Sequence, residues 1–295
     1  MSHYQLISDY KDHEVYKKSF NELAKMVFQI DFKNWYEKGC WNDKYICYSY
    51  IDGDKVIANA SISKMTIVSN GKEYNAIQVG TVMTHPDYRN QGLSTKLMNH
   101  IIEKYEKDYD FTYLFANKTV LDFYPTFGFE KVHESSYTMN ISEVKRLPAR
   151  STLRRLDITN EKDYELIQRF AVERISVSSI LGVINNESLL MFYLILVFND
   201  AIYYLEEEDV IVIYNHEDNQ LHLYDVISRK PVEIDYIINS IVTSETETIN
   251  FYFTPDYDGK EIHTEFITDS DDTLFVRPSF LEKKKHFQFP LTSHS

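Results

Sequence analysis

Residues 79 to 94 read Val-Gly-Thr-Val-Met-Thr-His-Pro-Asp-Tyr-Arg-Asn-Gln-Gly-Leu-Ser. The apolar start predicts a buried strand, and Pro86 fits just after it because proline cannot donate to a strand ladder. Apolar residues then recur at helical spacing: Leu93, Leu97, Met98, Ile101, Ile102 and Tyr105. The start of such a helix offers free N–H groups at the positive end of its dipole. We therefore predict a strand, a Gly92-containing turn and a helix that together form a phosphate seat.

A second motif follows this helix at a short distance. Tyr113-Leu114-Phe115 predicts a strand, and after Asn117 the chain reads Asp-Phe-Tyr-Pro-Thr-Phe-Gly-Phe-Glu over 122–130. The order of Arg89-x-x-Gly92-x-Ser94, helix, strand, Asn and Phe-Tyr-x-x-Phe-Gly-Phe resembles the GNAT superfamily of acyl-CoA-dependent N-acetyltransferases. The resemblance covers about residues 4 to 140. One position departs from it, because Ser94 stands where the family usually has Gly or Ala.

The resemblance implies acetyl-CoA as co-substrate and a set of residues that bind it. In the family, pantetheine adds to the sheet as a pseudo-strand, here along the strand end at Val82, Met83 and Thr84. The pyrophosphate would be wrapped by Arg89, Asn90, Gln91, Gly92, Leu93 and Ser94. Asn117 is a candidate contact to pantetheine or to the thioester, with a turn cap as its alternative role.

The same resemblance points to Tyr124 as the general acid that protonates the departing CoA thiolate. A phenol with a pKa near 10 is protonated at neutral pH and can donate to a thiolate whose thiol has a pKa near 8.5. Backbone N–H groups at the strand end would hold the acetyl oxygen. The residues do not identify the general base, and the candidates are His85, water and the C-terminal carboxylate of Ser295. We expect the tail that carries Ser295 to pack on the surface.

The pattern of apolar residues predicts an α/β (α+β) fold with a mixed, largely antiparallel sheet in residues 1–141. The expected elements are a strand at 4–7, a helix at 12–28, a hairpin of 44–51 with 55–67, a strand at 74–83 and a last strand pair within 127–139. Residues 142–152 are basic and contain a proline, and they predict a linker.

After the linker the chain repeats a strand-then-helix opening, and we assign 153–295 to a second domain. Strands are expected at 201–206, 209–214, 220–226 and 249–254, with a helix at 232–242. Ser228-Arg229-Lys230-Pro231 stands where a phosphate loop would be and lacks glycine. The second domain is therefore either a degenerate GNAT-like domain without a cofactor loop or an unrelated α+β domain. The whole chain resembles two-domain acetyltransferases of the enhanced-intracellular-survival type.

Charge is unevenly distributed along the chain. Residues 1–150 carry 19 Lys and Arg against 19 Asp and Glu, so the net charge of −14 lies entirely in the second half. This negative charge disfavours binding to nucleic acid and to anionic membranes. It either attracts a cationic substrate or keeps the protein soluble. The densest acidic run is 206–209.

No apolar run is long enough to span a bilayer, and no signal peptide is evident. Cys40 and Cys47 lack partners for a zinc site, so we expect no metal, two thiols and a cytoplasmic protein.

Two functions remain open at this point. The first is an enzyme, an acetyl-CoA-dependent N-acetyltransferase acting on a primary amine, either a small cationic molecule or a peptide amine. The second is a non-catalytic acyl-CoA sensor whose acidic domain engages a partner. A placed acid at Tyr124 favours the enzyme, and the oligomeric state is not predicted.

Overall fold

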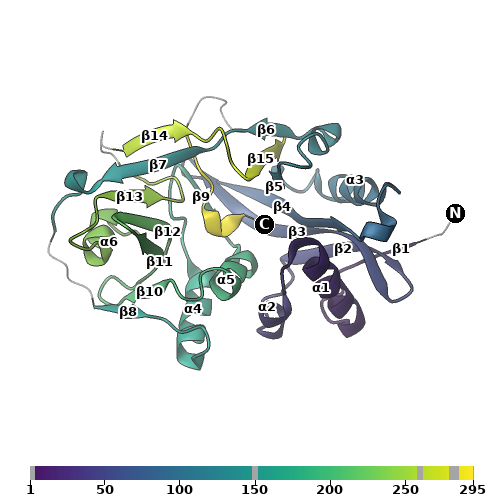
Figure 1. Ribbon diagram of the computed structural model, residues 1–295, viewed down its shortest axis with the longest axis horizontal. Coiled ribbons are helices and arrows are strands. Elements are labelled where there is room, and N and C mark those ends of the chain that lie inside the picture. The colour runs from purple at the N-terminus through teal and green to yellow at the C-terminus, as the bar shows by residue number, and fades with distance from the viewer. Residues whose placement is uncertain (1–3, 148–151, 258–261, 279–285, 295) are drawn as a thin grey trace.

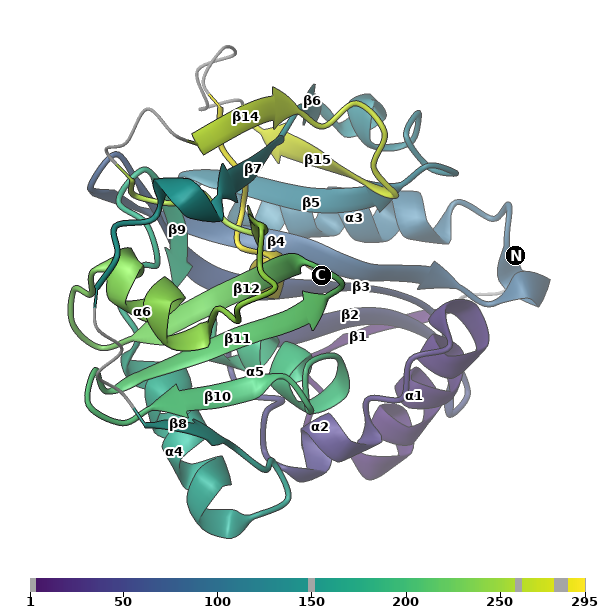
Figure 2. The same cartoon turned by 60° about the vertical axis from the view of Figure 1, so that its left-hand side comes forward.

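The computed structural model describes residues 4–147, 152–257, 262–278 and 286–294. Two mixed sheets stand side by side, with helices on their outer faces and between them (Figures 1 and 2). Within the described residues, no helix is both long and apolar enough to cross a membrane.

The first sheet has the strand order β1-β2-β3-β4-β5-β15-β6, and β9 pairs with β3 beside this path. Its strands are β1 (Gln5–Ser8), β2 (Tyr45–Asp52), β3 (Lys55–Ser69), β4 (Lys72–Thr84), β5 (Phe111–Asn117), β6 (Glu130–Val132), β9 (Leu181–Ile184) and β15 (Asp272–Arg277). Helix α3 (Leu93–Tyr105) lies on one face, while α1 (Glu14–Phe28) and α2 (Lys33–Glu37) lie on the other (Figure 1).

The second sheet has the order β14-β7-β13-β12-β11-β10-β8. Its strands are β7 (Ser135–Asn140), β8 (Leu153–Arg155), β10 (Ile202–Leu205), β11 (Val210–Glu217), β12 (Gln220–Ser228), β13 (Thr248–Phe251) and β14 (Ile262–Phe266). Its helices are α4 (Glu161–Glu173), α5 (Glu187–Leu196) and α6 (Ile234–Ile241). Strands β12 and β13 are parallel and α6 connects them, as α3 connects the parallel pair β4 and β5.

The prediction that two strands within 127–139 pair with each other is wrong. Strands β6 and β7 both form, but β6 pairs with β15, and β7 pairs with β13 and β14 of the second sheet. Strand β15 comes from the end of the chain and also pairs with β5. Periodicity indicates that a segment is a strand, but it carries no information about a partner more than a hundred residues away.

A shared apolar core joins the two halves of the chain. Trp35 of α2 is 1% exposed, and its indole N–H donates to the carbonyl of Ser188 in α5 over 2.9 Å. The Ser188 hydroxyl in turn donates to the carbonyl of Cys40 over 2.7 Å. Helix α5 is therefore fixed against the helices that cover the first sheet.

The C-terminal segment 286–294 is held between the two sheets (Figure 1). Leu291 N–H donates to the Tyr252 carbonyl over 2.9 Å, and the Phe289 ring stacks on Tyr113 of β5 with centroids 4.8 Å apart. The expectation of a surface-packed tail is wrong, because its aromatic residues enter the core: Phe287 is 5% and Phe289 0% exposed.

A buried ion pair anchors this tail. Both terminal nitrogens of Arg174 donate to the two carboxylate oxygens of Asp225 in β12, each over 2.9 Å, and the two side chains are 1% and 0% exposed. The hydroxyl of Thr292 donates to the same carboxylate. Asp225 therefore joins α4, β12 and the tail at one point.

Removing this carboxylate should strongly destabilise the protein. Asp225→Ala leaves the Arg174 guanidinium buried without its partner, which costs about 3–5 kcal/mol of unfolding free energy. Urea denaturation followed by tryptophan fluorescence measures this loss. The double variant Arg174→Met with Asp225→Leu removes both charges and should recover most of it, and a loss below about 1 kcal/mol in Asp225→Ala would contradict the anchoring role.

Candidate active site

Strands β4 and β5 diverge in the middle of the first sheet. They pair in parallel only at Ala76 with Phe111, Ile77 with Thr112, and Gln78 with Tyr113. Beyond these pairs the edge of β4 at 79–84 and the edge of β5 at 114–117 face a widening gap. Parallel strand edges present evenly spaced N–H and C=O groups, so this gap can accept an extended chain as an additional strand.

A β-bulge at Thr81 accompanies the divergence. The register of β3 against β4 shifts between Asn59 and Ser61, and Thr81 has a φ of +50°. The Asn59 side-chain amide donates to the Thr81 carbonyl over 2.9 Å, and the Tyr45 and Thr81 hydroxyls are 3.0 Å apart. A bulge increases the local twist and bends its strand, which here carries β4 away from β5.

A cavity of about 510 Å³ occupies the gap. Its lining comes from both faces of the first sheet, from α5 and from the tail. The lining residues are Phe28, Ile30, Phe32, Trp35, Tyr45, Val79, Gly80, Thr81, Val82, Ser94, Phe115, Ala116, Asn117, Val120, Phe123, Tyr124, Leu189, Phe192, Tyr193, Asp272 and His294.

The predicted phosphate turn lies at the start of α3, next to this gap. Gly92 is the residue before the helix, with φ +72° and ψ +17°, and a Cβ at this position would meet no protein atom within 4 Å. Arg89, Asn90, Gln91 and Gly92 are exposed, whereas Leu93 is buried in the core below α3. The turn therefore presents its backbone to solvent at a helix N-terminus.

Ser94 and the predicted strand-end residues have different surroundings. The Ser94 hydroxyl is 2.8 Å from the Thr84 hydroxyl, so its extra oxygen connects α3 to the end of β4. Val82 lines the cavity together with Ser94, but Met83 is 2% exposed and packs in the core on the α1 side. The structure thus brings Val82, Ser94, Asn117 and Tyr124 together around one cavity.

Tyr124 lies in the short helical turn Tyr124–Phe127 and is 6% exposed. Its ring packs between Phe123, Phe129 and Phe275, with centroid distances of 5.2, 6.3 and 5.8 Å. Burial raises the pKa of the Tyr124 phenol to about 12, so the hydroxyl stays protonated at neutral pH. In the described part of the chain its hydroxyl makes no hydrogen bond, which leaves the proton available to a ligand in the cavity.

Asn117 has a local structural role as well as a place in the cavity wall. Its carboxamide oxygen accepts hydrogen bonds from the amide and the hydroxyl of Thr119, over 3.0 and 2.5 Å. This turn ends β5, and the amide nitrogen of the side chain remains for other contacts.

His85 caps a turn and does not line the cavity. Its Nδ1 accepts a hydrogen bond from the Asp87 amide over 3.3 Å, at the start of the helical turn Pro86–Tyr88, and Lys55 Nζ is 3.0 Å from its Nε2. Ser295, whose carboxylate was the other named candidate for the base, lies outside the described residues.

A second histidine enters the cavity from the tail, and the motifs gave no sign of it. The His294 ring stacks on Phe115 with centroids 3.7 Å apart, and its Nε2 is buried with no partner in the described structure. Burial lowers the pKa of this imidazole to about 3, so the ring is neutral. The apolar tail with Phe287 and Phe289 was the available signal that this residue is held inside.

Helix α5 supplies another wall that sequence motifs did not reveal. Leu189, Phe192 and Tyr193 line the cavity, and the Phe192 ring packs on Phe32 with ring centroids 5.5 Å apart. The apolar run 189–198 predicts burial but does not indicate which surface it covers.

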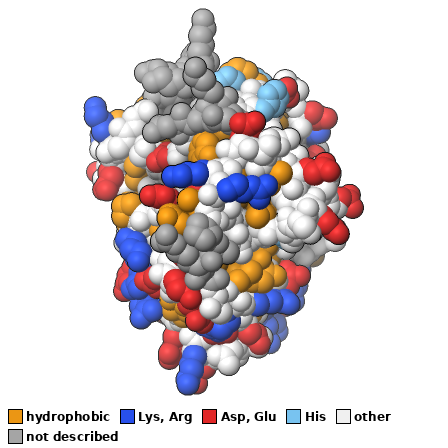
Figure 3. Space-filling view, turned by 90° about the vertical axis from the view of Figure 1, so that its left-hand side faces the viewer, with side chains coloured by type: hydrophobic (Ala, Val, Ile, Leu, Met, Phe, Trp, Pro, Cys, Tyr) orange, Lys and Arg blue, Asp and Glu red, His pale blue; other side chains and the backbone are white. Residues whose placement is uncertain are grey.

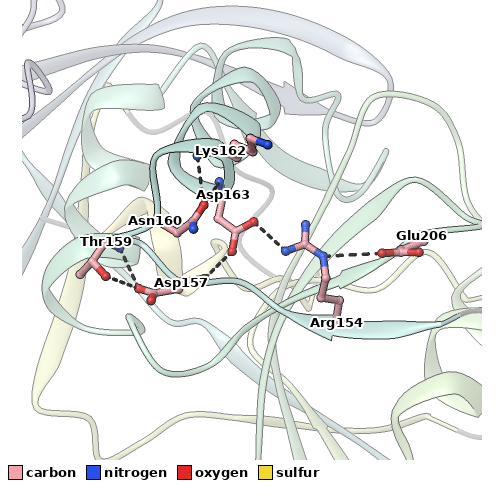
Figure 4. A network of polar contacts seen from close by, with 7 residues as sticks. All are labelled: Arg154, Asp157, Thr159, Asn160, Lys162, Asp163 and Glu206. Atoms are coloured by element: carbon pink, nitrogen blue, oxygen red, sulfur yellow. Dashed lines mark hydrogen bonds and ion pairs between the residues drawn. The ribbon is translucent and has the colours of Figure 1, made fainter.

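The acidic run 206–209 lies at the turn between β10 and β11 and does not line the cavity. Glu206 is 3.6 Å from the guanidinium of Arg154, which also donates to Asp163 in α4 over 2.6 Å (Figure 4). Asp209 pairs with Arg229 over 2.6 Å. On the face shown in Figure 3, acidic, basic and apolar side chains are intermixed.

Comparisons with known proteins agree with this geometry. The family model of the acetyltransferase (GNAT) domain matches residues 12–132. No curated protein matches the sequence. Among solved structures, a probable N-acyltransferase from Enterococcus faecalis matches with a TM-score of 0.62 and 16% identity. The match spans 94% of this chain and 72% of the Enterococcus chain.

Two further structures match over nearly the whole chain. The match to Eis1 from Mycobacterium abscessus spans 92% of this chain and 72% of the Eis1 chain, with 14% identity and a TM-score of 0.59. A GCN5-related N-acetyltransferase from Kribbella flavida covers 92% and 71%, with 17% identity and a TM-score of 0.55. These likenesses extend the fold beyond the matched domain to the second half. Residues 12–132 therefore match the GNAT acetyltransferase domain model, and more than nine-tenths of the chain shares its fold with Eis1 and these related structures.

Proposed function

We propose that this chain is an acetyl-CoA-dependent N-acetyltransferase that acetylates a primary amine in the cytoplasm. The observation that carries the proposal is the gap between β4 and β5, which has the start of α3 at one end and Tyr124 in its wall. Strand edges, helix N-terminus and phenol are the parts that acyl transfer from a thioester requires.

The residues present fit acetyl-CoA. The exposed backbone of 89–92 lies at the positive end of the α3 dipole and suits a pyrophosphate. The free edges at 79–82 and 114–117 suit the amide groups of pantetheine. Asn117 has an amide nitrogen available in the same wall.

The reaction needs one acid and one route for a proton. The amine nitrogen attacks the thioester carbonyl, a C–N bond forms and the C–S bond breaks. The sulfur leaves with the electron pair and takes the Tyr124 proton, and the nitrogen loses its proton to a base. A phenol whose pKa is raised to about 12 donates to a thiolate only when the two are in direct contact, and the buried position of Tyr124 beside the gap suits this.

We assign the second sheet to a GNAT-like second domain without a cofactor loop, built mainly from 153–295, while β9 and β15 of that range join the first sheet. The parallel pair β12 and β13 with α6 repeats the arrangement of β4, α3 and β5. Here the chain's own tail lies beside the pair, since Thr292 bonds to Asp225 and Leu291 bonds to Tyr252. The second sheet thus positions the tail instead of a nucleotide.

Release of free CoA thiol from acetyl-CoA, measured with a panel of amines, tests the proposed function. Turnover of any amine supports an enzyme. Binding of acetyl-CoA by calorimetry without turnover on any amine would favour the acyl-CoA sensor instead.

Gly92→Val should lower the affinity for acetyl-CoA at least about 10-fold, because a β-branched side chain is strained at φ +72° and projects where phosphate would lie. Gly71→Val is the matched control. Gly71 also has φ +72° with no protein atom near its Cβ, but it lies in the β3–β4 turn. Calorimetry should show the loss only at Gly92, and equal affinities in the two variants would remove the phosphate seat from this turn.

Tyr124→Phe should reduce kcat by about 10²- to 10⁴-fold, the usual contribution of a general acid, with the affinity for acetyl-CoA nearly unchanged. Tyr105→Phe is the control, since its hydroxyl bonds to Tyr48 over 2.6 Å in the core and does not line the cavity. Steady-state kinetics of both variants checks this. Wild-type kcat in Tyr124→Phe would make the residue a packing group only.

A further inference from the structure

The chemistry of the acceptor can be inferred from the side of the cavity that faces away from α3. This inference rests on the proposed function. On that side the wall consists of side chains from the α1–α2 region, from α5 and from β5, and it is chiefly aromatic. Its members include Phe28, Phe32, Trp35, Phe115, Phe192 and Tyr193.

Charged groups are scarce on this wall. Asp272, the first residue of β15, is the one carboxylate that lines the described cavity, and no Lys or Arg of the described chain lines it. Burial raises the pKa of Asp272 above its usual range, which weakens its tendency to ionise. In the acidic run 206–209 at the β10–β11 turn, Glu206 contacts Arg154 and Asp209 pairs with Arg229.

One buried polar atom on this wall lacks a partner. Nε2 of His294 has no hydrogen bond in the described structure, while the ring itself is held by stacking on Phe115. Buried polar atoms are nearly always hydrogen-bonded, so an unpaired one in a ligand-sized cavity indicates a contact that a ligand completes. The backbone of Phe289 accepts a hydrogen bond from the ring and only Nε2 is left without a partner, so the ring proton lies on Nδ1. Nε2 then accepts a hydrogen bond, and its partner must be a donor.

We propose that the acceptor substrate is a primary amine on an uncharged aromatic or aliphatic body, whose N–H donates to Nε2 of His294 while the body packs on the aromatic wall that Phe32 and Phe192 form together. A polycation does not fit, because each further ammonium group would lose its water against aromatic carbons with one carboxylate at most to pair with. An acyl chain longer than acetyl would share the apolar chemistry, but it has no N–H to offer to His294.

The contact also orients the amine for attack. In the hydrogen bond to Nε2 the nitrogen lone pair stays free to attack the thioester carbonyl. As the C–N bond forms and the C–S bond breaks, the nitrogen proton passes to water, because an imidazole whose pKa is lowered to about 3 is too weak a base to take it. Tyr124 supplies the proton that the sulfur takes, and His294 positions the amine.

Matched amines test the substrate class. Hexylamine and hexamethylenediamine have the same chain and differ by one terminal amine, and phenethylamine carries an aromatic body. In the thiol-release assay, kcat/KM for hexylamine and phenethylamine should exceed that for hexamethylenediamine and spermidine by about 10²-fold or more. A diamine or polyamine used equally well or better would overturn the inference and leave the proposed function intact.

Two further outcomes distinguish a failure of the inference from a failure of the proposed function. If hexanoyl-CoA is used in strong preference to acetyl-CoA and the amine body makes no difference, the aromatic wall holds the acyl chain and the inference is wrong. If acetyl-CoA binds but no amine of either kind is acetylated, the proposed function fails and the inference fails with it.

Variants of the wall test the packing of the body. Phe192→Ala should raise KM for phenethylamine about 10-fold or more, with a smaller change in the affinity for acetyl-CoA. Phe266→Ala is the control, because Phe266 lies on β14, is 45% exposed and does not line the cavity. Equal KM values in the two variants would contradict the assignment of this wall.

Variants of His294 test the acceptor nitrogen. His294→Phe keeps a ring to stack on Phe115 but removes the nitrogen, and it should lower kcat about 10²-fold or more. His294→Gln places an acceptor oxygen near the position of Nε2 and should restore part of the loss. If His294→Phe keeps wild-type kcat, or if the two variants are equally impaired, the nitrogen has no role in the reaction.

The pH profile is a readout that packing alone would not affect. Burial lowers the pKa of His294 to about 3, so the nitrogen is an acceptor at every pH above that value. The titratable groups that line the cavity with it are Tyr45, Asp272, Tyr124 and Tyr193, and burial raises the pKa of each. The profile of kcat should have no step near pH ~6.5, the ordinary value for histidine. A step there that disappears in His294→Gln would show that the imidazole titrates and would overturn its neutral role.

Discussion

The divergence of β4 from β5 is the constraint on which the rest of the site depends. A parallel pair that continued to Thr84 and Asn117 would satisfy its own backbone groups and leave no room for a ligand. The bulge at Thr81, fixed by hydrogen bonds from Asn59 and Tyr45, ends that pairing after three residue pairs. This local change of strand direction produces the cavity, the free strand edges and the access to Tyr124.

The second half of the chain contributes walls and a tail to this gap. Its buried ion pair between Arg174 and Asp225 would be costly in isolation, because two desolvated charges do not by themselves stabilise a fold. The pair matters because of where it lies. The Asp225 carboxylate also accepts a hydrogen bond from the Thr292 hydroxyl, which fixes the last residues of the chain beside the first sheet. His294 and the aromatic face of α5 then line the same gap.

The acidity of the second half has a structural explanation in several places. Asp163 and Asp157 order the start of α4, and Glu206 and Asp209 pair with arginines of the same sheet (Figure 4). These contacts give four of the carboxylates in this half a structural partner. The wall of the described cavity is chiefly aromatic, and Asp272 is the one carboxylate in it.

The sequence by itself determined many of the strands and helices, the glycine turn before α3 and the match of residues 12–132 to the acetyltransferase domain model, because each depends on short-range pattern: apolar period, a glycine before a helix, and a motif of fixed spacing. Tertiary structure alone decided the insertion of β15 beside β5, the transfer of β7 to the second sheet and the entry of His294 into the cavity. These depend on contacts between residues about 110 to 180 positions apart. Local periodicity is the same for a strand whichever partner it finds, so only the packed chain shows which residues share the site.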